Sequence, residues 1–277
     1  MPDAAFSLLL PVYHGDDPGF FRRAFESATG EQTLIPDEAL IVRDGPVGPA
    51  LEAALAQAAA STVTAVRVLR LPENVGLGRA LDAGLAQCTH EIVARMDADD
   101  VCFPRRFARQ VPLVATDYDI VGAAIVEFDR ESDPSTGGIL RVPPASPADI
   151  AARARFHSPF NHPSVVYRRS VVQGAGGYED LPMLEDYWLF ARMLAAGARA
   201  YNIPDPLLRY RVSAGSYSRR GGVKLFCSEI ELQRRLRRIG FISRPTWLRN
   251  VVVRGMYRLT PEALRRPLYR TFVAHGA

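Results

Sequence analysis

The stretch Glu91-Ile-Val-Ala-Arg-Met-Asp-Ala-Asp-Asp100 decides the fold, because an apolar run passes directly into three carboxylates. The run 92–94 has the length and β-branching of a strand that is buried in a sheet. The residues after the stretch favour a helix. We therefore expect Asp97, Asp99 and Asp100 on the turn that leaves the carboxyl end of this strand. In open α/β sheets, ligands bind at this edge.

The residues of this turn alone leave two interpretations open. Carboxylates this close repel one another unless a cation or hydrogen-bond donors offset their charge. Hard oxygen ligands suit Mg²⁺ or Mn²⁺, which bind through one or two carboxylates and the phosphates of a substrate. In the alternative, the turn is solvated, and Asp99 or Asp100 caps the next helix.

Strand and helix patterns alternate through the first hundred residues. Strands are expected at 6–12, 38–44, 66–71 and in the opening stretch, with helices at 18–27, 49–60 and before Cys88. This alternation predicts an α/β fold with a parallel, doubly wound sheet, in which all the carboxyl ends share one edge. The polar residues that follow these strands should converge at that edge: Tyr13, Asp44, Asn74 with Arg79, and Asp97 with Asp99.

Beyond residue 100 the alternation is less regular. We expect helices at 105–116, 147–155 and 184–194, strands at 119–128, from Ser164, at 200–203 and at 207–212, and a loop or hairpin at 129–147. His157 and His162 lie close together, but such pairs are more often loop residues than metal ligands. Glu185 and Asp186 open a helix, where acids favour the helix dipole or one of them acts as a general base.

The composition is that of a soluble protein. No apolar stretch approaches the ~20 residues of a membrane span, and residues 1–10 lack the basic region of a secretory signal. The three cysteines are widely spaced, which suggests neither a disulfide framework nor a zinc site. A cytoplasmic protein is therefore expected.

The C-terminal segment 221–277 is strongly basic. It holds Lys224 and eleven arginines against three acids, a net charge of +9, which leaves −5 for the first 220 residues of a chain at +4. Basic helices with Trp and Leu on the opposite face suit an anionic membrane surface. In the alternative, these helices pack on the body of the protein or form a homodimer interface. No zinc or stacking motif indicates specific nucleic-acid binding.

The order of several motifs resembles that of family 2 glycosyltransferases with the GT-A fold, nearest to bacterial enzymes of capsule, exopolysaccharide or O-antigen synthesis. The motifs are Leu10-Pro-Val-Tyr13, Glu73-Asn-Val-Gly-Leu-Gly-Arg79, Arg95-Met-Asp-Ala-Asp-Asp100 and Glu185-Asp186, supported by His162-Pro-Ser164 and Tyr210-Arg211. The resemblance covers about Phe6–Ser218. It implies a GT-A catalytic domain at 1–220, with a nucleotide-binding half at 1–100 and an acceptor-binding half at 101–220. A basic helical extension follows at 221–277.

The resemblance also assigns roles to individual residues. Pro11, Tyr13 and Asp44 would contact the nucleotide base, and Asn74, Gly76 and Arg79 would lie near the base or the diphosphate. Asp97 and Asp99 would form the Asp-X-Asp motif that holds Mn²⁺ or Mg²⁺, with Asp97 facing the nucleotide and Asp99 as the main metal ligand. Asp100 would cap the next helix. Asp186 would be the catalytic base, with Glu185 beside it and His162 and Trp188 on the acceptor side.

The implied activity is an inverting, metal-dependent transfer of a sugar from a nucleoside-diphosphate sugar to a hydroxyl. A UDP-sugar is favoured as donor, and a saccharide or a lipid-linked saccharide as acceptor. The implied cellular location is the cytoplasm or the inner face of the membrane. Two departures stand out: Val42-Arg-Asp44 has one acid where the family usually has two, and Ser213 stands where many members have a metal-binding histidine.

Two rival functions are weighed against this one. A sugar-phosphate nucleotidyltransferase would need a Gly-rich loop directly after the first strand, and Pro11-Val-Tyr-His14 lacks it. A non-catalytic sugar-nucleotide-binding or scaffold subunit would not need to retain Asp97, Asp99 and Asp186.

Overall fold

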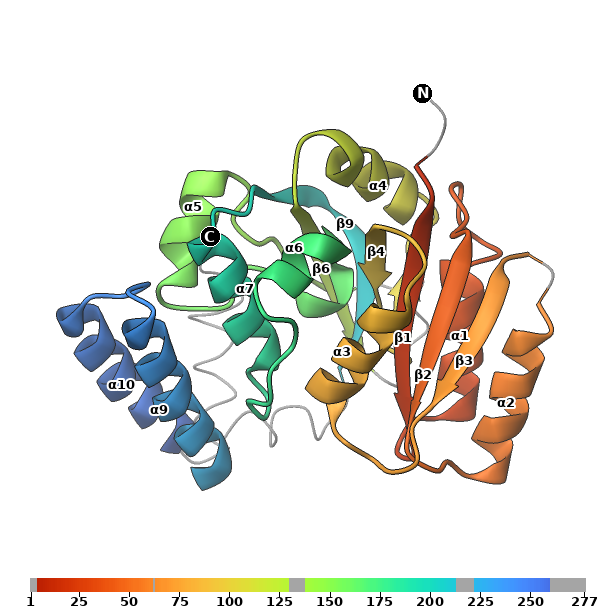
Figure 1. The fold of residues 1–277 in the computed structure, drawn as a ribbon, viewed down its shortest axis with the longest axis horizontal. Helices are drawn as coiled ribbons and strands as arrows, with labels where there is room; N and C mark the ends of the chain where they lie inside the picture. Colours follow the sequence, from red (N-terminus) through yellow and green to blue (C-terminus); the bar gives the residue numbers. More distant parts are fainter. Residues whose placement is uncertain (1–3, 62, 130–137, 213–221, 260–277) are drawn as a thin grey trace.

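The computed structural model describes residues 4–61, 63–129, 138–212 and 222–259, and its elements are labelled in Figure 1. The strands are β1 (Phe6–Tyr13), β2 (Glu38–Asp44), β3 (Ala65–Arg70), β4 (Ile92–Arg95), β5 (Val101–Cys102), β6 (Ile120–Asp129), β7 (Ile139–Arg141), β8 (Val166–Arg168) and β9 (Ala200–Val212). The helices are α1 (Pro18–Ala28), α2 (Pro49–Ala59), α3 (Leu77–Gln87), α4 (Arg106–Thr116), α5 (Pro147–Ala154), α6 (Arg169–Gly174), α7 (Glu185–Ala195), α9 (Val223–Arg238) and α10 (Arg244–Leu259), with a 3₁₀ turn η1 (His162–Ser164).

One mixed sheet runs through the molecule in the order β3-β2-β1-β4-β8-β6-β9-β5, with β7 beside β6. The strands β3, β2, β1 and β4 pair in parallel. The short strand β8 runs antiparallel to both β4 and β6, whereas β6 and β9 pair in parallel. The predicted α/β class with a mostly parallel, doubly wound sheet is therefore confirmed, and the antiparallel strands belong to its second half.

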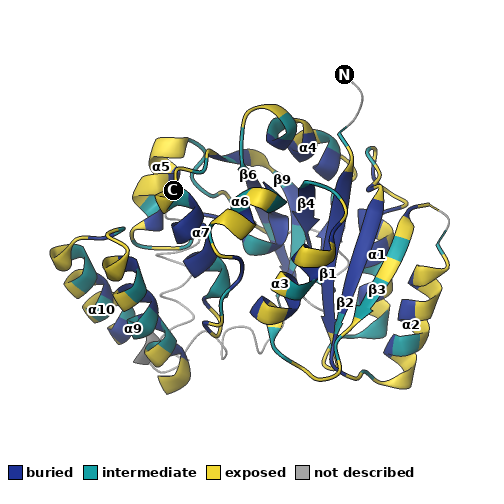
Figure 2. Ribbon diagram, in the orientation of Figure 1, coloured by how far each residue is buried: buried dark blue, intermediate teal, exposed yellow. Residues whose placement is uncertain are grey.

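Helices cover both faces of the sheet because side chains on successive strand positions point to opposite faces. Helices α1, α2 and α4 pack with Leu8 and Ala94 on one face. Helices α3, α5, α6 and α7 pack with Leu9 and Val93 on the other. Figure 2 shows the central strands buried and the outer sides of α2 and α10 exposed.

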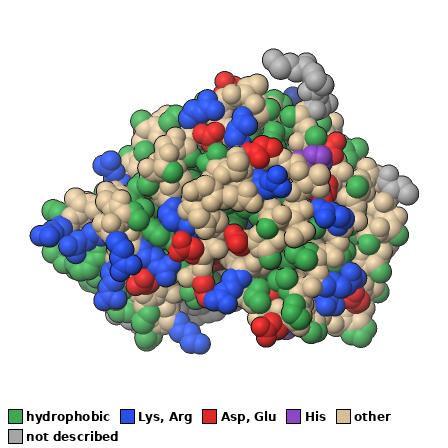
Figure 3. Space-filling model, viewed as in Figure 1, with side chains coloured by type: hydrophobic (Ala, Val, Ile, Leu, Met, Phe, Trp, Pro, Cys, Tyr) green, Lys and Arg blue, Asp and Glu red, His purple; other side chains and the backbone are tan. Residues whose placement is uncertain are grey.

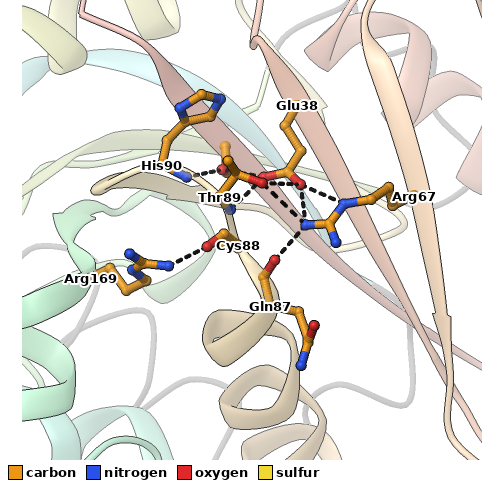
Figure 4. A network of polar contacts seen from close by, with 8 residues as sticks. Glu38, Arg67, Gln87, Cys88, Thr89, His90 and Arg169 are labelled. Atoms are coloured by element: carbon orange, nitrogen blue, oxygen red, sulfur yellow. Dashed lines mark hydrogen bonds and ion pairs between the residues drawn. The ribbon is translucent and has the colours of Figure 1, made fainter.

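A polar network fixes the amino-terminal edge of the sheet (Figure 4). The carboxylate of Glu38, at the start of β2, accepts hydrogen bonds from Ser7 Oγ at 2.6 Å and from the amide of Thr89 at 2.8 Å. Arg67 of β3 forms an ion pair with the same carboxylate, and Arg169 donates to the carbonyl of Cys88. These bonds tie β1, β2, β3 and the end of α3 together, at the edge opposite the carboxylate turn.

The basic C-terminal helices pack on the body of the protein, which was one of the alternatives for this segment. Leu225, Leu232 and Leu236 of α9 form an apolar cluster with Tyr187 and Trp188 of α7. Lys and Arg side chains gather over α9 and α10, at the left of the view in Figure 3. None of the described helices is long and apolar enough to span a membrane. Residues 260–277 of the predicted helical extension lie outside the described residues.

Two sequence-based expectations differ from the structure in the second half of the sheet. Two short strands were expected where β9 runs continuously from Ala200 to Val212, with register shifts where it passes Ala124 of β6. Pro204 and Pro206 lack amide donors, so they interrupt the ladder and make one strand read as two. The expected loop or hairpin is a hairpin, since β7 pairs antiparallel with β6.

Candidate active site

The carboxyl ends of β1, β2 and β4 meet at one edge of the sheet, as the alternation predicted. Tyr13 lies opposite Asp44 in the register of β1 and β2, and Leu9 lies opposite Arg95 in the register of β1 and β4. Asp97 follows β4 directly on the turn 96–100, where its side chain is 27% exposed. The polar residues of separate loops are thus brought to a common edge.

The expectation that Asp100 caps the following helix is wrong. Asp100 is fully buried, and its Oδ1 accepts a hydrogen bond from the amide of Arg211 at 2.9 Å. Helix α4 begins only at Arg106, and its N-cap residue Arg105 makes no side-chain cap bond. The reason is the short strand β5, which comes between the turn and α4 and pairs with β9. That pairing places Asp100 beside the end of β9.

Arg95 is a component of this edge that the sequence analysis did not assign a role. It is 1% exposed, and its Nη2 lies 2.5 Å from Oδ1 of Asp97. Alternation along β4 places it on the face of Val93, beneath α3 and α7. Its Nε and Nη1 are buried without a hydrogen-bond partner among the described residues. The signal that could have identified Arg95 from the sequence is a charged residue at a core position of a buried strand.

The carboxylates of the turn are crowded. Burial, followed by the charge of Asp97, raises the pKa of Asp99 to about 6. Asp16, from the loop between β1 and α1, also faces this turn and was not singled out from the sequence. Burial raises the pKa of Asp16 to about 7, opposed by the hydrogen bond from the amide of Tyr13 and reinforced by the charges of Asp99 and Asp97. The carboxylates of this turn and of Asp16 therefore leave an excess of negative charge at this edge of the sheet.

The predicted metal ligands fit a divalent cation of the Mg²⁺ or Mn²⁺ type. Within the described ranges, no three His, Cys, Asp or Glu side chains converge into a cage that could hold a metal ion. Asp97 and Asp99 alone suffice for ions that take one or two carboxylates and complete their shell with substrate phosphates and water. The excess negative charge at the turn favours such a cation. Ser213, the position of the missing histidine, lies outside the described residues.

Asp44 organises the loop between β3 and α3. Its carboxylate accepts hydrogen bonds from the amides of Val75 at 2.7 Å and Gly76 at 3.1 Å. Asn74 Nδ2 donates to the carbonyl of Asp44 at 3.3 Å. Gly76, the N-cap of α3, has a φ of +89° and open space around its Cβ position, so conformation alone favours glycine there. The predicted residues Asp44, Asn74 and Gly76 are therefore brought together.

The remaining predicted donor-side residues surround this loop. Pro11 is buried in β1, opposite Val42 of β2. Tyr13, at the end of β1, is 38% exposed and offers a ring to a ligand at this edge. Arg79, in the first turn of α3, forms an ion pair with Asp180 at 3.0 Å. Its guanidinium thus joins α3 to the segment that precedes α7.

Asp186, the predicted catalytic base, and its neighbour Glu185 occupy the first turn of α7. Burial, then the charge of Asp186, raises the pKa of Glu185 to about 7. Burial also raises the pKa of Asp186, while the amide of Tyr187 and the charge of Arg95 oppose the rise. A Cβ at Gly78 of α3 would lie 3.3 Å from Cβ of Glu185, so α3 and the start of α7 are in close contact. The buried Arg95 acts electrostatically on both carboxylate groups of the edge.

His162 and Trp188, the predicted acceptor residues, have different surroundings. His162 Nε2 lies 3.1 Å from the hydroxyl of Tyr178, and burial, together with the charge of Arg95, holds the pKa of His162 well below its usual value. Trp188 is 5% exposed and donates from Nε1 to Glu179 at 2.9 Å. Helix α9 covers Trp188, so the structure gives this residue a packing role rather than a surface that faces an acceptor.

A comparison of the sequence with known protein families identifies the family of this chain. Residues 7–174 match the family described as "Glycosyl transferase family 2". The chain belongs to glycosyl transferase family 2. The resemblance inferred from the motifs of the sequence is therefore confirmed.

Full-length relatives support this membership. The chain is 36% identical over 269 residues to the amylovoran biosynthesis glycosyltransferase AmsE of Erwinia amylovora, with 95% of this chain and 97% of the relative covered. It is 33% identical over 270 residues to the UDP-Gal:alpha-D-GlcNAc-diphosphoundecaprenol beta-1,3-galactosyltransferase of Escherichia coli, with 97% and 96% covered.

Solved structures share the fold. The S. aureus TarS 1–349 complex with UDP-GlcNAc superimposes with a TM-score of 0.69 at 14% identity, over 97% of this chain and 76% of that one. The mannosyltransferase PcManGT of Pyrobaculum calidifontis, in complex with GDP-Man and Mn²⁺, gives 0.63 at 19% identity, over 98% and 76%. The GT-A fold expected for the catalytic part is confirmed by these neighbours.

Proposed function

We propose that the chain transfers a sugar from a nucleoside-diphosphate sugar to a hydroxyl group of a growing cell-surface polysaccharide. The observation that carries this proposal is the convergence of the Asp97–Asp99 turn and Asp186 around the buried Arg95. The turn follows a sheet strand at the ligand-binding edge, and Asp186 opens a helix that packs against α3. The Asp97–Asp99 turn is suited to binding a diphosphate, and Asp186 is suited to binding a hydroxyl group.

The donor is held by the first half of the chain in this proposal. Tyr13 and the loop that Asp44 organises contact the nucleoside, while Asp97 and Asp99 hold Mn²⁺ or Mg²⁺ on the diphosphate. The bound cation neutralises the charge that develops on the leaving diphosphate. We favour a UDP-sugar because the Escherichia coli relative is named for UDP-Gal and TarS is solved with UDP-GlcNAc.

Asp186 accepts the proton of the attacking hydroxyl. A carboxylate must be ionised for this task, and the charge of Arg95 favours the ionised form of Asp186 although burial opposes it. A single base with no nucleophile on the opposite face of the sugar leads to inversion at the anomeric carbon. Burial and the charge of Asp186 raise the pKa of the neighbouring Glu185 to about 7, so Glu185 is less readily ionised at neutral pH.

The acceptor in this proposal is a saccharide on a lipid carrier at the inner face of the membrane. The Escherichia coli relative is named for a diphosphoundecaprenol acceptor. Leu248, Val252 and Met256 of α10 are exposed and recur every four residues, so they form one apolar stripe on a helix that carries arginines. An apolar stripe among basic residues suits an anionic lipid surface. A homodimer interface is the alternative use of this stripe.

The direct test is a panel of nucleoside diphosphates and their sugars, each with Mn²⁺, Mg²⁺ or EDTA. Thermal unfolding should shift upward for one base and only with a divalent cation, because a ligand that binds the folded state alone stabilises it. Release of nucleoside diphosphate from the stabilising donor is then measured with and without a lipid-linked acceptor. No shift with any donor contradicts the proposal. A shift without turnover in either case indicates a binding subunit instead.

A further inference from the structure

Glu179 joins the catalytic part of the chain to the C-terminal helix α9. Its carboxylate forms ion pairs with Arg192 of α7 at 3.0 Å and with Arg235 of α9 at 3.2 Å. The same carboxylate accepts the hydrogen bond from Trp188 Nε1 at 2.9 Å. Three side chains on two helices thus hold one acid whose side chain is 45% exposed.

The segment that contains Glu179 is held against α3 on its other side. The amide of Tyr178 donates to Asp82 Oδ1 at 2.9 Å, and Asp180 pairs with Arg79. Gly177 has a φ of +65°, and a Cβ there would lie 2.2 Å from Asp82 Oδ1, so only glycine permits this approach. Residues 175–184 therefore lie between α3 and α9, with polar contacts to both.

The same segment leads directly into the first turn of α7. Arg192 donates to the carbonyls of Ala175 and Gly177 at 2.6 Å each, and it pairs with Glu179 beside them. The amide of Leu184 bonds to the carbonyl of Leu181 one residue before α7 begins. Any displacement of the segment therefore moves the start of the helix that carries Asp186.

We propose that Arg235 is a positioning residue for the transfer reaction. Through Glu179 it holds residues 175–184 against α3, which fixes the first turn of α7, and with it Asp186, relative to the carboxylate turn. This inference rests on the proposed function for its catalytic consequence. Its structural consequence, the ordering of residues 175–184 by α9, does not depend on that function.

The variants are chosen so that packing is preserved. Arg235→Met keeps a side chain of similar length and removes the ion pairs with Glu179 and Glu231 and the cation–π contact with the Trp188 ring. Glu179→Gln keeps an acceptor for Trp188 Nε1 and removes the charge. Arg235→Lys keeps a positive charge that can pair with Glu179, so it should retain part of the wild-type behaviour. Arg234→Met is the matched control, because Arg234 is exposed and has no hydrogen bond or ion pair among the described residues.

Hydrogen exchange of the peptide over residues 175–184 is the readout that does not depend on activity. We expect exchange to become about tenfold faster in Arg235→Met and Glu179→Gln than in Arg234→Met, because this segment loses its anchor on α9. The effects of the two changes should be less than additive in the double variant, because both remove the pair between Glu179 and Arg235, although each also removes a second pair, with Arg192 or with Glu231. Exchange equal to that of the control overturns the inference.

Turnover supplies the catalytic readout. With the wild-type chain active, kcat should fall about tenfold in Arg235→Met, while the affinity for nucleoside diphosphate stays within about twofold, because the donor side is unchanged. A fall in nucleotide affinity with unchanged kcat contradicts a role in placing Asp186. If the wild-type chain has no transferase activity, the proposed function fails, and the exchange experiment still decides the structural claim.

Discussion

Nη2 of Arg95 lies 2.5 Å from Oδ1 of Asp97, so a buried guanidinium pairs with a carboxylate that is 27% exposed. The same guanidinium acts electrostatically on Glu185 and Asp186 at the start of α7. A buried charge is retained at a cost unless it is paired. Arg95 therefore connects the two halves of the site through one side chain.

The first prediction concerns this pair. Arg95→Met should weaken the binding of nucleoside diphosphate with Mn²⁺ by about tenfold, because Asp97 loses the charge-assisted bond that orients it. The free energy of unfolding should fall by only about 1–3 kcal/mol, since Asp97 remains partly exposed to water. Titration calorimetry and denaturant unfolding check the two values. Unchanged affinity in a folded variant would show that the pair does not orient the donor.

A second prediction separates the two acids of α7. Asp186→Asn should lower the rate of transfer by about 10²–10⁴-fold, the usual contribution of a general base, while nucleotide affinity stays within about twofold. Glu185→Gln should have a much smaller effect on rate. Steady-state rates of both variants, measured with the same donor, test the assignment. A larger loss in Glu185→Gln would transfer the role of base to Glu185.

Replacement of Asp99 should stabilise the metal-free protein but weaken nucleotide binding when a metal ion is present. In the metal-free protein at pH 8, Asp99→Asn should raise the free energy of unfolding by about 1–2 kcal/mol, because burial and Asp97 disfavour the ionised carboxylate. With Mn²⁺ present, the same variant should lose most of its affinity for nucleoside diphosphate. Thermal unfolding in EDTA and calorimetry in Mn²⁺ provide the comparison. A variant that keeps full metal-dependent binding would exclude Asp99 as a ligand.

The pH dependence of stability gives a further test. The pKa values of Asp16 and Glu185 are raised in the folded protein, each to about 7, so the folded state binds more protons than the unfolded state between about pH 4 and 7. The free energy of unfolding of the metal-free protein should therefore fall as pH rises through this window. Asp16→Asn should reduce that fall by up to about 4 kcal/mol. Parallel curves for variant and wild type would contradict the placement of Asp16.

The last prediction concerns the apolar stripe of α10. Replacement of Leu248, Val252 and Met256 by Ser should reduce co-sedimentation with phosphatidylglycerol vesicles several-fold. The variant loses the apolar area that would be buried in the lipid surface on binding, while the arginines remain. Val223→Ser is the matched control, since Val223 is a similarly exposed apolar residue at the start of α9. Undiminished vesicle binding, with a shift from dimer to monomer in sedimentation, would assign the stripe to self-association.

Sequence patterns predicted the first half of the fold almost element by element. The buried runs of β1, β2 and β4 and the Pro residues at the starts of α1 and α2 are local signals, and local signals suffice for βαβ units. The second half was harder, because its pairings join distant segments. The pairing of β5 with β9, which redirects Asp100, depends on residues more than a hundred positions apart. No periodicity within either segment contains that information.

The motif residues of the candidate site carry a signal of their roles in the sequence, whereas the charged residues that support them do not. Asp97, Asp99 and Asp186 belong to recognisable motifs, whereas Asp16 and Arg95 take their roles from what packs around them. Two roles stay open for Trp188 at the level of sequence, since an aromatic residue beside a candidate base can line a pocket or fill a core. The contact with α9 decides between the two, and the sequence does not reveal which helix will cover it.

The apolar contact between α7 and α9 also bears on how this chain can be divided. Leu181, Leu184, Tyr187 and Trp188 are all buried together with residues of α9. A chain that ended after β9 would leave these four side chains, which adjoin Glu185 and Asp186, open to water. The helix that carries Asp186 and the basic helix α9 thus share one apolar cluster, so the boundary expected from the sequence near residue 220 is not a boundary in side-chain packing.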